Sequence, residues 1–303
     1  MLMSYREDHF LKFQPDKTSE WPDYTTGQSP EKDRELFLRM LKKGIHGFCY
    51  SIYEEGQKPG DIIGESQIRK RMQILKFHTR WIRSFSCIEG NQFIPVIARE
   101  MGLKTLVGAW LGDDREKNEM EIDNLIRLAR EGFVDIAAVG NEVLYRDDLS
   151  EGELLEYIDR VKKAIPGVPV GYVDAYYEFS ARPALTSVCD VILSNCYPFW
   201  EGTPLEYSME HVIQMYEQAY RAGNGKQVII TETGWPTAGG AFGGAIPSEE
   251  NAISYFINIH SWAQERGVDV FHFSSFDESW KVGAEGDLGA HWGIWDKSEK
   301  LKF

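Results

Sequence analysis

The sequence contains no hydrophobic run approaching the roughly 18 residues that a membrane-spanning helix requires. It is also short of positive charge, because 33 lysines and arginines against 47 aspartates and glutamates give a formal net charge of −14. Nucleic-acid-binding surfaces are basic, so this balance argues against such a partner. Charged residues interrupt the first 21 residues, which show no secretory signal. We therefore expect no membrane partner and a cytoplasmic protein, or a periplasmic or secreted one if a signal was removed.

Cysteine is scarce as well, and its spacing excludes two classes of protein. The four cysteines have neither the spacing of zinc ligands nor the density of a disulfide framework. The seven histidines include no pair at the helical spacing of zinc proteases. We expect no metal and no cofactor, and we interpret Cys49, Cys87 and Cys196, near the ends of predicted strands, as small buried residues.

Short apolar segments alternate with helical segments from residue 44 to residue 303. The predicted strands are 45–50, 80–85, 104–110, 134–141, 168–173, 190–197, 226–232 and 269–276. One of the helices between them begins with a capping box formed by Ser150 and Glu153. Strands that alternate with helices indicate parallel βαβ units. Eight units in a chain of this length predict an α/β fold with a single-domain (β/α)8, or TIM, barrel.

Two further features bear on this architecture. A doubly wound open sheet is the alternative, but residues 49–61 lack the glycine-rich dinucleotide fingerprint expected after its first strand. Residues 1–43 are polar and contain three prolines, so we expect an N-terminal extension that packs outside the barrel. We expect residues 44–303 to form the catalytic barrel, and we expect a monomer.

Polar and aromatic residues gather where the predicted strands end, which is where barrel enzymes place their active sites. Glu142 and Glu232 end the fourth and seventh strands, on opposite sides of the barrel mouth. Two such carboxyls can flank one scissile bond, as glycoside hydrolysis requires. Sugar rings pack on aromatic side chains, and the candidate platforms are Trp110, Tyr197, Phe199, Trp200, Trp235, Trp280 and Trp292.

Four motifs, AVGNEVLYR, NCYPFW, TETGWPT and FDESWK, together resemble glycoside hydrolase family 17. This family contains β-1,3-glucanases and β-1,3-glucan transglycosylases built on a (β/α)8 barrel, and the resemblance spans residues 45–296. It implies that Glu142 is the general acid/base and Glu232 the nucleophile of a retaining double displacement. The chain lacks the long insertions of plant members, so it is most similar to a compact microbial form.

The resemblance also implies the surroundings of the two glutamates. Asn141 would hold the sugar 2-hydroxyl, and Tyr197 would hydrogen-bond Glu232. Phe85 stands where many members have tyrosine, which affects the detail of the wall near Arg83. The complete set of expected substrate-binding residues is Tyr50, Arg83, Asn141, Tyr197, Trp235, Glu278, Lys281 and Trp292.

The residues leave several functions open. The first is a retaining hydrolase of β-1,3-glucan of the laminarin type, with a β-1,3-gluco-oligosaccharide or polysaccharide as its substrate. The second is a β-1,3-glucan transglycosylase that passes the glucosyl group to another sugar. The third is a carbohydrate-binding barrel without catalysis, which the presence of both glutamates argues against. The fourth is a phosphosugar-binding barrel, which the acidic residues after the glycine-rich loop 237–245 argue against.

Overall fold

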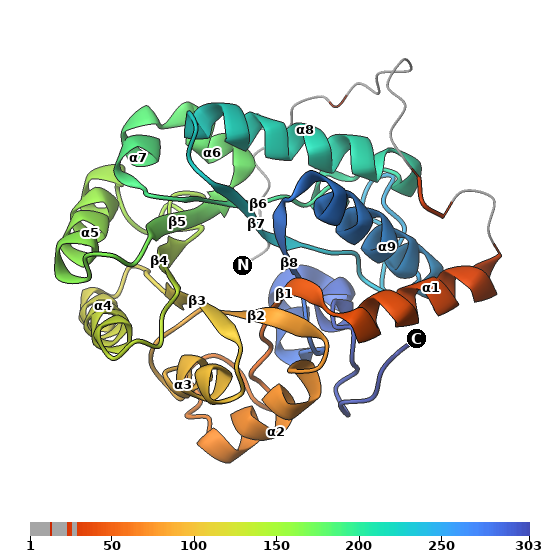
Figure 1. The fold of residues 1–303 in the computed structure, drawn as a ribbon, viewed down its shortest axis with the longest axis horizontal. Helices are drawn as coiled ribbons and strands as arrows, with labels where there is room; N and C mark the ends of the chain where they lie inside the picture. Colours follow the sequence, from red (N-terminus) through yellow and green to blue (C-terminus); the bar gives the residue numbers. More distant parts are fainter. Residues whose placement is uncertain (1–12, 14–22, 26–28) are drawn as a thin grey trace.

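The computed structural model describes residue 13 and residues 23–25 and 29–303. Within these residues, eight parallel strands close into a barrel in chain order and helices surround it (Figure 1). The predicted (β/α)8 barrel is therefore confirmed. The strands are β1 (Ile45–Cys49), β2 (Thr79–Ser84), β3 (Lys104–Ala109), β4 (Ile136–Asn141), β5 (Val170–Ala175), β6 (Ile192–Asn195), β7 (Val228–Thr233) and β8 (Asp269–His272).

The helices follow the strands around the outside of the barrel (Figure 1). The α-helices are α1 (Pro30–Lys43), α2 (Glu65–Leu75), α3 (Phe93–Glu100), α4 (Arg115–Arg130), α5 (Glu151–Ala164), α6 (Tyr176–Ala181), α7 (Pro183–Val188), α8 (Leu205–Gly223), α9 (Glu249–Arg266) and α10 (Val282–Glu285). The 3-10 helices of the described residues are η2 (Phe199–Glu201), η3 (Ser279–Lys281) and η4 (Gly286–His291). Among the described residues, no helix has both the length and the apolar character needed to cross a membrane.

Local sequence signals explain several helix ends. The Ser150 side chain accepts a hydrogen bond from the Glu153 amide, and the Glu153 side chain accepts one from the Ser150 amide. This reciprocal arrangement is the predicted capping box at the start of α5. Helix α9 begins after Ser248, whose side chain accepts from the Asn251 amide, and ends at Gly267 in the left-handed conformation.

The predicted strand ends lie within two residues of the observed ones, with one exception. The last strand was expected to span 269–276, but β8 ends at His272. Beyond it, successive amides donate to the carbonyls of different segments: Phe273 to Thr233, Ser274 to Trp292 and Ser275 to Cys49. A chain that changes partners at each residue forms no regular ladder. After β5 the chain forms two short helices, α6 and α7, and α7 starts at Pro183.

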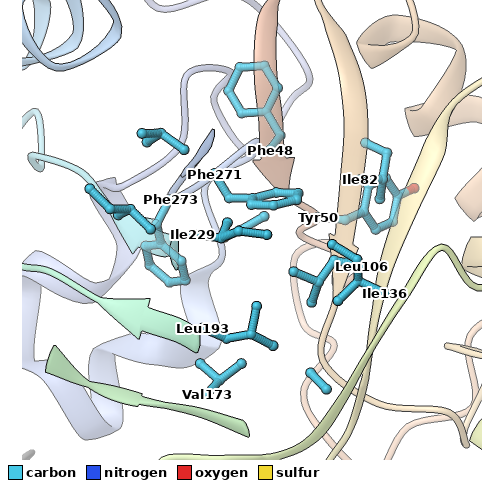
Figure 2. Packing of buried hydrophobic residues seen from close by; sticks show 14 of the residues in the cluster. Phe48, Tyr50, Ile82, Leu106, Ile136, Val173, Leu193, Ile229, Phe271 and Phe273 are labelled. Atoms are coloured by element: carbon cyan, nitrogen blue, oxygen red, sulfur yellow. The ribbon is translucent and has the colours of Figure 1, made fainter. Parts of the chain in front are cut away.

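Side-chain alternation along the strands separates the barrel interior from the layer beneath the helices. A Cβ on Gly47 would lie 2.4 Å from the Phe271 ring, so Phe271 fills the interior space beside β1. The neighbouring Phe48 contacts His272 and Trp295 instead, on the other face of β1. Figure 2 shows Phe271, Ile229 and Leu106, from three different strands, directed toward one another inside the barrel. This packed interior supports the strand ends above it.

The predicted N-terminal extension lies only partly within the described residues. Residues 1–12, 14–22 and 26–28 are outside them, so the structure does not describe this part of the prediction. Helix α1 lies outside the barrel beside α9 (Figure 1), and Phe37 of α1 packs against Phe256 of α9 at a ring-centroid distance of 4.7 Å.

The strand ends leave little room at Gly234, which directly follows β7. A Cβ at this position would lie 2.1 Å from the Phe273 carbonyl oxygen, and neither backbone can move without displacing its strand. We expect Gly234→Ala to destabilise the protein by about 1–3 kcal/mol, which urea unfolding would measure.

Gly152 provides the matched control. It lies in α5, and an added Cβ would meet no heavy atom within 4 Å. Gly152→Ala should be neutral or stabilising by up to about 1 kcal/mol. Equal effects of the two substitutions would contradict the steric argument.

Candidate active site

Glu232 lies near the end of β7 with its carboxylate buried among hydrogen-bond donors. Arg83 Nη1 donates to its Oε1 at 2.7 Å, and Asn195 Nδ2 donates to the same oxygen at 3.1 Å. Tyr197 Oη donates to Oε2 at 2.8 Å, which is the contact that the resemblance implied. Hydrogen bonds from such donors stabilise the ionised form of a carboxyl group.

Glu142 directly follows β4, where the chain turns sharply. Its backbone is left-handed, with φ of 51°, which is uncommon for a residue other than glycine. Its amide donates to the Val173 carbonyl at 2.8 Å, and its carbonyl accepts from the Arg146 amide at 2.9 Å. This turn points the Glu142 carboxyl toward β6, where Asn195 Nδ2 donates to Oε1 at 2.8 Å.

Asn195 therefore joins the two glutamates. Its single Nδ2 group donates to both carboxyls, and its Oδ1 accepts from Thr231 Oγ1 at 2.9 Å, which fixes the orientation of the amide. The sequence analysis assigned no role to Asn195. The signal that could have identified it is alternation, because it lies two residues before Tyr197 and so faces the same side of the chain.

Arg83 and Asn141 form the wall between β2 and β4. Arg83 Nη2 donates to Asn141 Oδ1 at 2.6 Å while its Nη1 is bound to Glu232, and the guanidinium stacks on Phe85 at 4.2 Å. Arg83 is only 1% exposed. Its donors position Glu232 and Asn141, and whether Arg83 also contacts substrate stays a prediction. The structure leaves the proposed contact between Asn141 and a sugar hydroxyl as a prediction.

The Tyr50 side chain points away from the barrel interior, so the prediction that it contacts substrate is wrong. Cys49 points inward, where its Sγ donates to the Thr231 carbonyl, so the next residue points outward. Tyr50 Oη donates to the Ile68 carbonyl of α2 at 2.8 Å, in the layer between the barrel and the helices. The prediction failed because it considered only that Tyr50 ends the first strand, and not that successive residues of a strand point to opposite faces.

Two tryptophans expected to bind sugar are buried instead, each 2% exposed. Trp235 donates from Nε1 to the Ile246 carbonyl at 2.9 Å and packs on Phe199. Trp292 packs against Tyr197 at a centroid distance of 5.7 Å. Whether either ring contacts a sugar stays a prediction. Trp292 also supports the ring of Tyr197, whose hydroxyl binds Glu232.

Glu278 and Lys281 form a buried ion pair, with Oε2 and Nζ 2.8 Å apart. The Tyr53 amide donates to Glu278 Oε1 at 3.2 Å, and Lys281 lies over the Phe273 ring at 4.2 Å. Burial alone would lower the pKa of Lys281, but nearby carboxylates, with Glu278 foremost, outweigh it and raise the pKa. Whether this pair contacts substrate stays a prediction.

Glu285 is a further carboxyl of the site that sequence reasoning missed. Its Oε2 accepts from Trp292 Nε1 at 3.1 Å. Burial raises its pKa to about 7, opposed by Lys281 and the Trp292 hydrogen bond, and the charges of Glu232 and Glu142 raise it further. Its position in the short helix α10, within an irregular loop, gave no periodic signal that could have identified it.

The two central glutamates differ in their electrostatic surroundings. Burial is the largest cause that raises the pKa of Glu142 to about 7, and the charge of Glu232 is the second. The Asn195 hydrogen bond and the charges of Arg146 and Arg83 lower this pKa, but they do not cancel the rise. Glu142 can therefore hold a proton near neutral pH, beside a carboxyl group that is surrounded by donors.

A pocket opens beside Glu142, on the side of β5 and β6. Its other lining residues are Tyr145, Ala175, Tyr176, Tyr177, Asn195, Tyr197, Trp200 and Glu201. Aromatic rings with polar edges suit the apolar faces and hydroxyls of a sugar. Trp110, at the end of β3, is 41% exposed, and the Arg146 guanidinium stacks on it at 4.5 Å.

Metal ligation has no geometric basis in the part of the chain that the structure describes. No group of three or more His, Cys, Asp or Glu side chains there could hold an ion. All four cysteines are free and buried, in agreement with their interpretation as small buried residues, and burial raises the pKa of Cys49 to about 12. A buried thiol with a raised pKa is a poor nucleophile.

Comparison with known proteins agrees with this geometry. A family model described as the BtgE/BtgC glycoside hydrolase domain matches residues 47–293. The glucan 1,3-β-glucosidase BGL2 of Candida albicans is 28% identical over 258 residues, which cover 77% of this chain and 83% of that protein. A glucan 1,3-β-glucosidase of Saccharomyces cerevisiae is 28% identical over 267 residues, covering 78% and 84%.

A solved structure is similar along nearly its whole length. It is the glycoside hydrolase family 17 β-1,3-glucanosyltransferase from Rhizomucor miehei, with a TM-score of 0.77 and 28% identity, covering 86% of this chain and 96% of that one. An active-site mutant of the same enzyme in complex with laminaritriose matches equally well. The chain therefore belongs to the BtgE/BtgC family of glycoside hydrolases, among the glucan 1,3-β-glucosidases and β-1,3-glucanosyltransferases that resemble family 17.

Proposed function

We propose that this protein cleaves β-1,3-glucan by a retaining double displacement, with Glu232 as the nucleophile and Glu142 as the general acid/base. The observation that carries the proposal is the hydrogen bonding of Asn195 to both carboxyls. Glu142 Oε1 and Glu232 Oε1 lie 2.8 and 3.1 Å from one nitrogen, so they are at most roughly 6 Å apart. Retaining enzymes hold their carboxyls about 5–5.5 Å apart, whereas inverting enzymes need about 6.5–9.5 Å to admit a water molecule.

The surroundings of each glutamate support the division of roles. In the first step, Glu142 gives its proton to the glycosidic oxygen while the Glu232 carboxylate attacks the anomeric carbon and the bond to the leaving sugar breaks. Glu142, with its pKa of about 7, holds the proton for this step. Glu232 needs to be an anion, and the donors Arg83, Asn195 and Tyr197 stabilise that anion.

In the second step Glu142 acts as a base, whereas it acted as an acid in the first. Once Glu232 is an ester it carries no charge, so the pKa of Glu142 falls, because repulsion by Glu232 is one cause of its rise. Glu142 can then take a proton from an incoming hydroxyl group as that oxygen attacks the anomeric carbon. The bond to Glu232 breaks, and the product keeps the configuration of the substrate.

A β-1,3-glucan is supported as the substrate by the relatives rather than by the site geometry. The curated relatives are named glucan 1,3-β-glucosidases, and the related solved enzyme was captured with laminaritriose. Aromatic side chains alone do not determine which linkage is cut. We therefore assign the linkage by similarity and the mechanism by geometry.

Transglycosylation is the second candidate, and one observation favours it. The pocket lies beside Glu142, on the side where a leaving sugar departs and an acceptor sugar enters. An acceptor held there would compete with water for the glucosyl-enzyme. The similar Rhizomucor miehei enzyme is a β-1,3-glucanosyltransferase. The same two glutamates serve both outcomes, and only the identity of the incoming hydroxyl differs.

The first prediction tests the nucleophile. Glu232→Ala should lower turnover of laminarin oligosaccharides by at least about 10⁴-fold, while near-UV circular dichroism stays unchanged. Azide should restore part of the activity and yield a glucosyl azide of inverted, α configuration. Glu217→Ala is the control, because Glu217 is an exposed glutamate on α8. A Glu232→Ala protein with full activity would refute the assignment.

The second prediction tests the acid. Glu142 must be protonated in the free enzyme, so kcat/KM should fall as the pH rises through about 7. In Glu232→Gln the repelling charge is gone, and carbon-13 NMR should show Glu142 titrating at lower pH. It should still titrate above its ordinary value of 4.5, because burial is the larger cause. An unchanged or higher pKa in that variant would refute the coupling.

The third prediction concerns products. Proton NMR in the first minutes should show β anomers, and initial α anomers would mean inversion and a wider gap between the carboxyls.

Laminarin oligosaccharides should react much faster than cellulose oligosaccharides. Longer oligosaccharides among the products would identify a transferase, and new reducing ends alone would identify a hydrolase. Equal rates on both polymers would overturn the β-1,3 assignment.

A further inference from the structure

Behind Glu142, on the side away from Glu232, two polar side chains of β5 are fully buried. Tyr172 and Asp174 are two residues apart and so lie on the same face of the strand. Each is 0% exposed. Neither lines the pocket, and the two-step mechanism uses neither of them.

These side chains form a chain of hydrogen bonds that ends at the turn carrying Glu142. Tyr172 Oη donates a short hydrogen bond to Asp174 Oδ2 and accepts one from the Leu144 amide at 2.9 Å. Asp174 Oδ1 accepts from the Ala175 amide at 2.7 Å. Because the Tyr172 hydroxyl donates its proton to Asp174, a lone pair of Tyr172 Oη is left to accept from the Leu144 amide.

The turn needs such support. Gly140 and Glu142 both have positive φ, of 85° and 51°, and a left-handed backbone is unfavourable for glutamate. Two hydrogen bonds tie the turn to β5, one from the Glu142 amide to the Val173 carbonyl and one from the Leu144 amide to Tyr172. Tyr172 also lies under Gly140, where an added Cβ would be 3.3 Å from its ring.

We propose that Tyr172 and Asp174 are positioning residues for the general acid: they hold the turn 140–144 so that the Glu142 carboxyl reaches the glycosidic oxygen. This inference rests on the proposed role of Glu142. A general acid must come within about 2.6–3.2 Å of the atom that it protonates. A displacement of roughly 1 Å can lower a rate about 10²-fold, so a lost anchor two residues away is sufficient to impair proton transfer.

A merely structural role would give a different kinetic result. If the two residues only stabilise the barrel, their loss lowers the rate on every substrate to the same degree. If they position the acid, the loss depends on the leaving group. A 2,4-dinitrophenyl leaving group departs without a proton, whereas a sugar leaving group requires one. The value of kcat/KM reports the first, glycosylation step for both substrates.

The experiment compares kcat/KM of Tyr172→Phe on a laminarin oligosaccharide and on the 2,4-dinitrophenyl glycoside of laminaribiose. We expect a loss of about 10- to 100-fold on the oligosaccharide and less than about 3-fold on the dinitrophenyl glycoside. Tyr50→Phe is the matched control. It also removes a buried tyrosine hydroxyl bonded to the main chain, but at β1 and away from Glu142. Its losses on the two substrates should be equal.

Asp174→Asn provides a second variant of nearly unchanged volume, should Tyr172→Phe fail to fold. Its single amide oxygen must serve both the Tyr172 hydroxyl and the Ala175 amide, so we expect a smaller loss that is again confined to the oligosaccharide. Equal losses on both substrates in either variant would overturn the proposal.

Glu142→Gln, measured in parallel, separates this inference from the proposed function. If Glu142 is the acid, this variant loses far more on the oligosaccharide than on the dinitrophenyl glycoside. A leaving-group effect in Glu142→Gln but not in Tyr172→Phe overturns the positioning role alone. If Glu142→Gln shows no leaving-group effect, the positioning role and the assignment of Glu142 as the acid are both overturned.

Discussion

The site depends on one constraint: the Glu232 carboxylate is buried, so it must be satisfied from several strands at once. The ion pair with Arg83 spans from β7 to β2, and the bonds from Asn195 and Tyr197 come from the end of β6. A buried charge that loses one partner is costly, by about 3–5 kcal/mol in measured cases. These donors can surround one carboxylate only if the strands close into a barrel. The barrel therefore brings these donors to the charge, and two of them, Arg83 and Asn195, also hold Asn141 and Glu142 in place.

The wider charge balance explains where protons reside. The carboxyls of the site outnumber its buried cations, which are Arg83 and Lys281. The carboxyls are Glu142, Glu232, Glu278 and Glu285. Arg83 pairs with Glu232, and Lys281 pairs with Glu278. Among the residues that the structure describes, no cation lies at ion-pair distance from the remaining two carboxyls, Glu142 and Glu285, and both have a pKa raised to about 7, chiefly by burial. Buried negative charge without a matching cation is thus neutralised by protons, which is the condition a general acid needs.

Much of this arrangement could be predicted from the sequence, because strand alternation and strand ends are local signals. The eight strands placed Glu142 and Glu232 at the same mouth, and the end of β6 placed Tyr197 near them. Tyr50 was misassigned because its outward direction depends on which face of the strand Cys49 takes. The structure shows that Cys49 points inward, and residue type alone does not reveal this. The role of Asn195 could have been found by the same alternation. Glu285 could not, since it lies in an irregular loop whose path depends on contacts with Trp292 and Lys281.

The tryptophans show why residue type alone does not define a sugar site. Trp292 and Trp235 are as suited to stacking as any other tryptophan, but both are buried and both pack against η2, which follows β6. Their burial has a consequence for catalysis, because Trp292 and Phe273 pack against the ring of Tyr197 and so fix the hydroxyl that donates to Glu232. An aromatic cluster that fixes a hydrogen-bond donor contributes to the reaction whether or not it touches the sugar. The aromatic residues that line the pocket beside Glu142, and the exposed Trp110, are further candidates for contact with substrate.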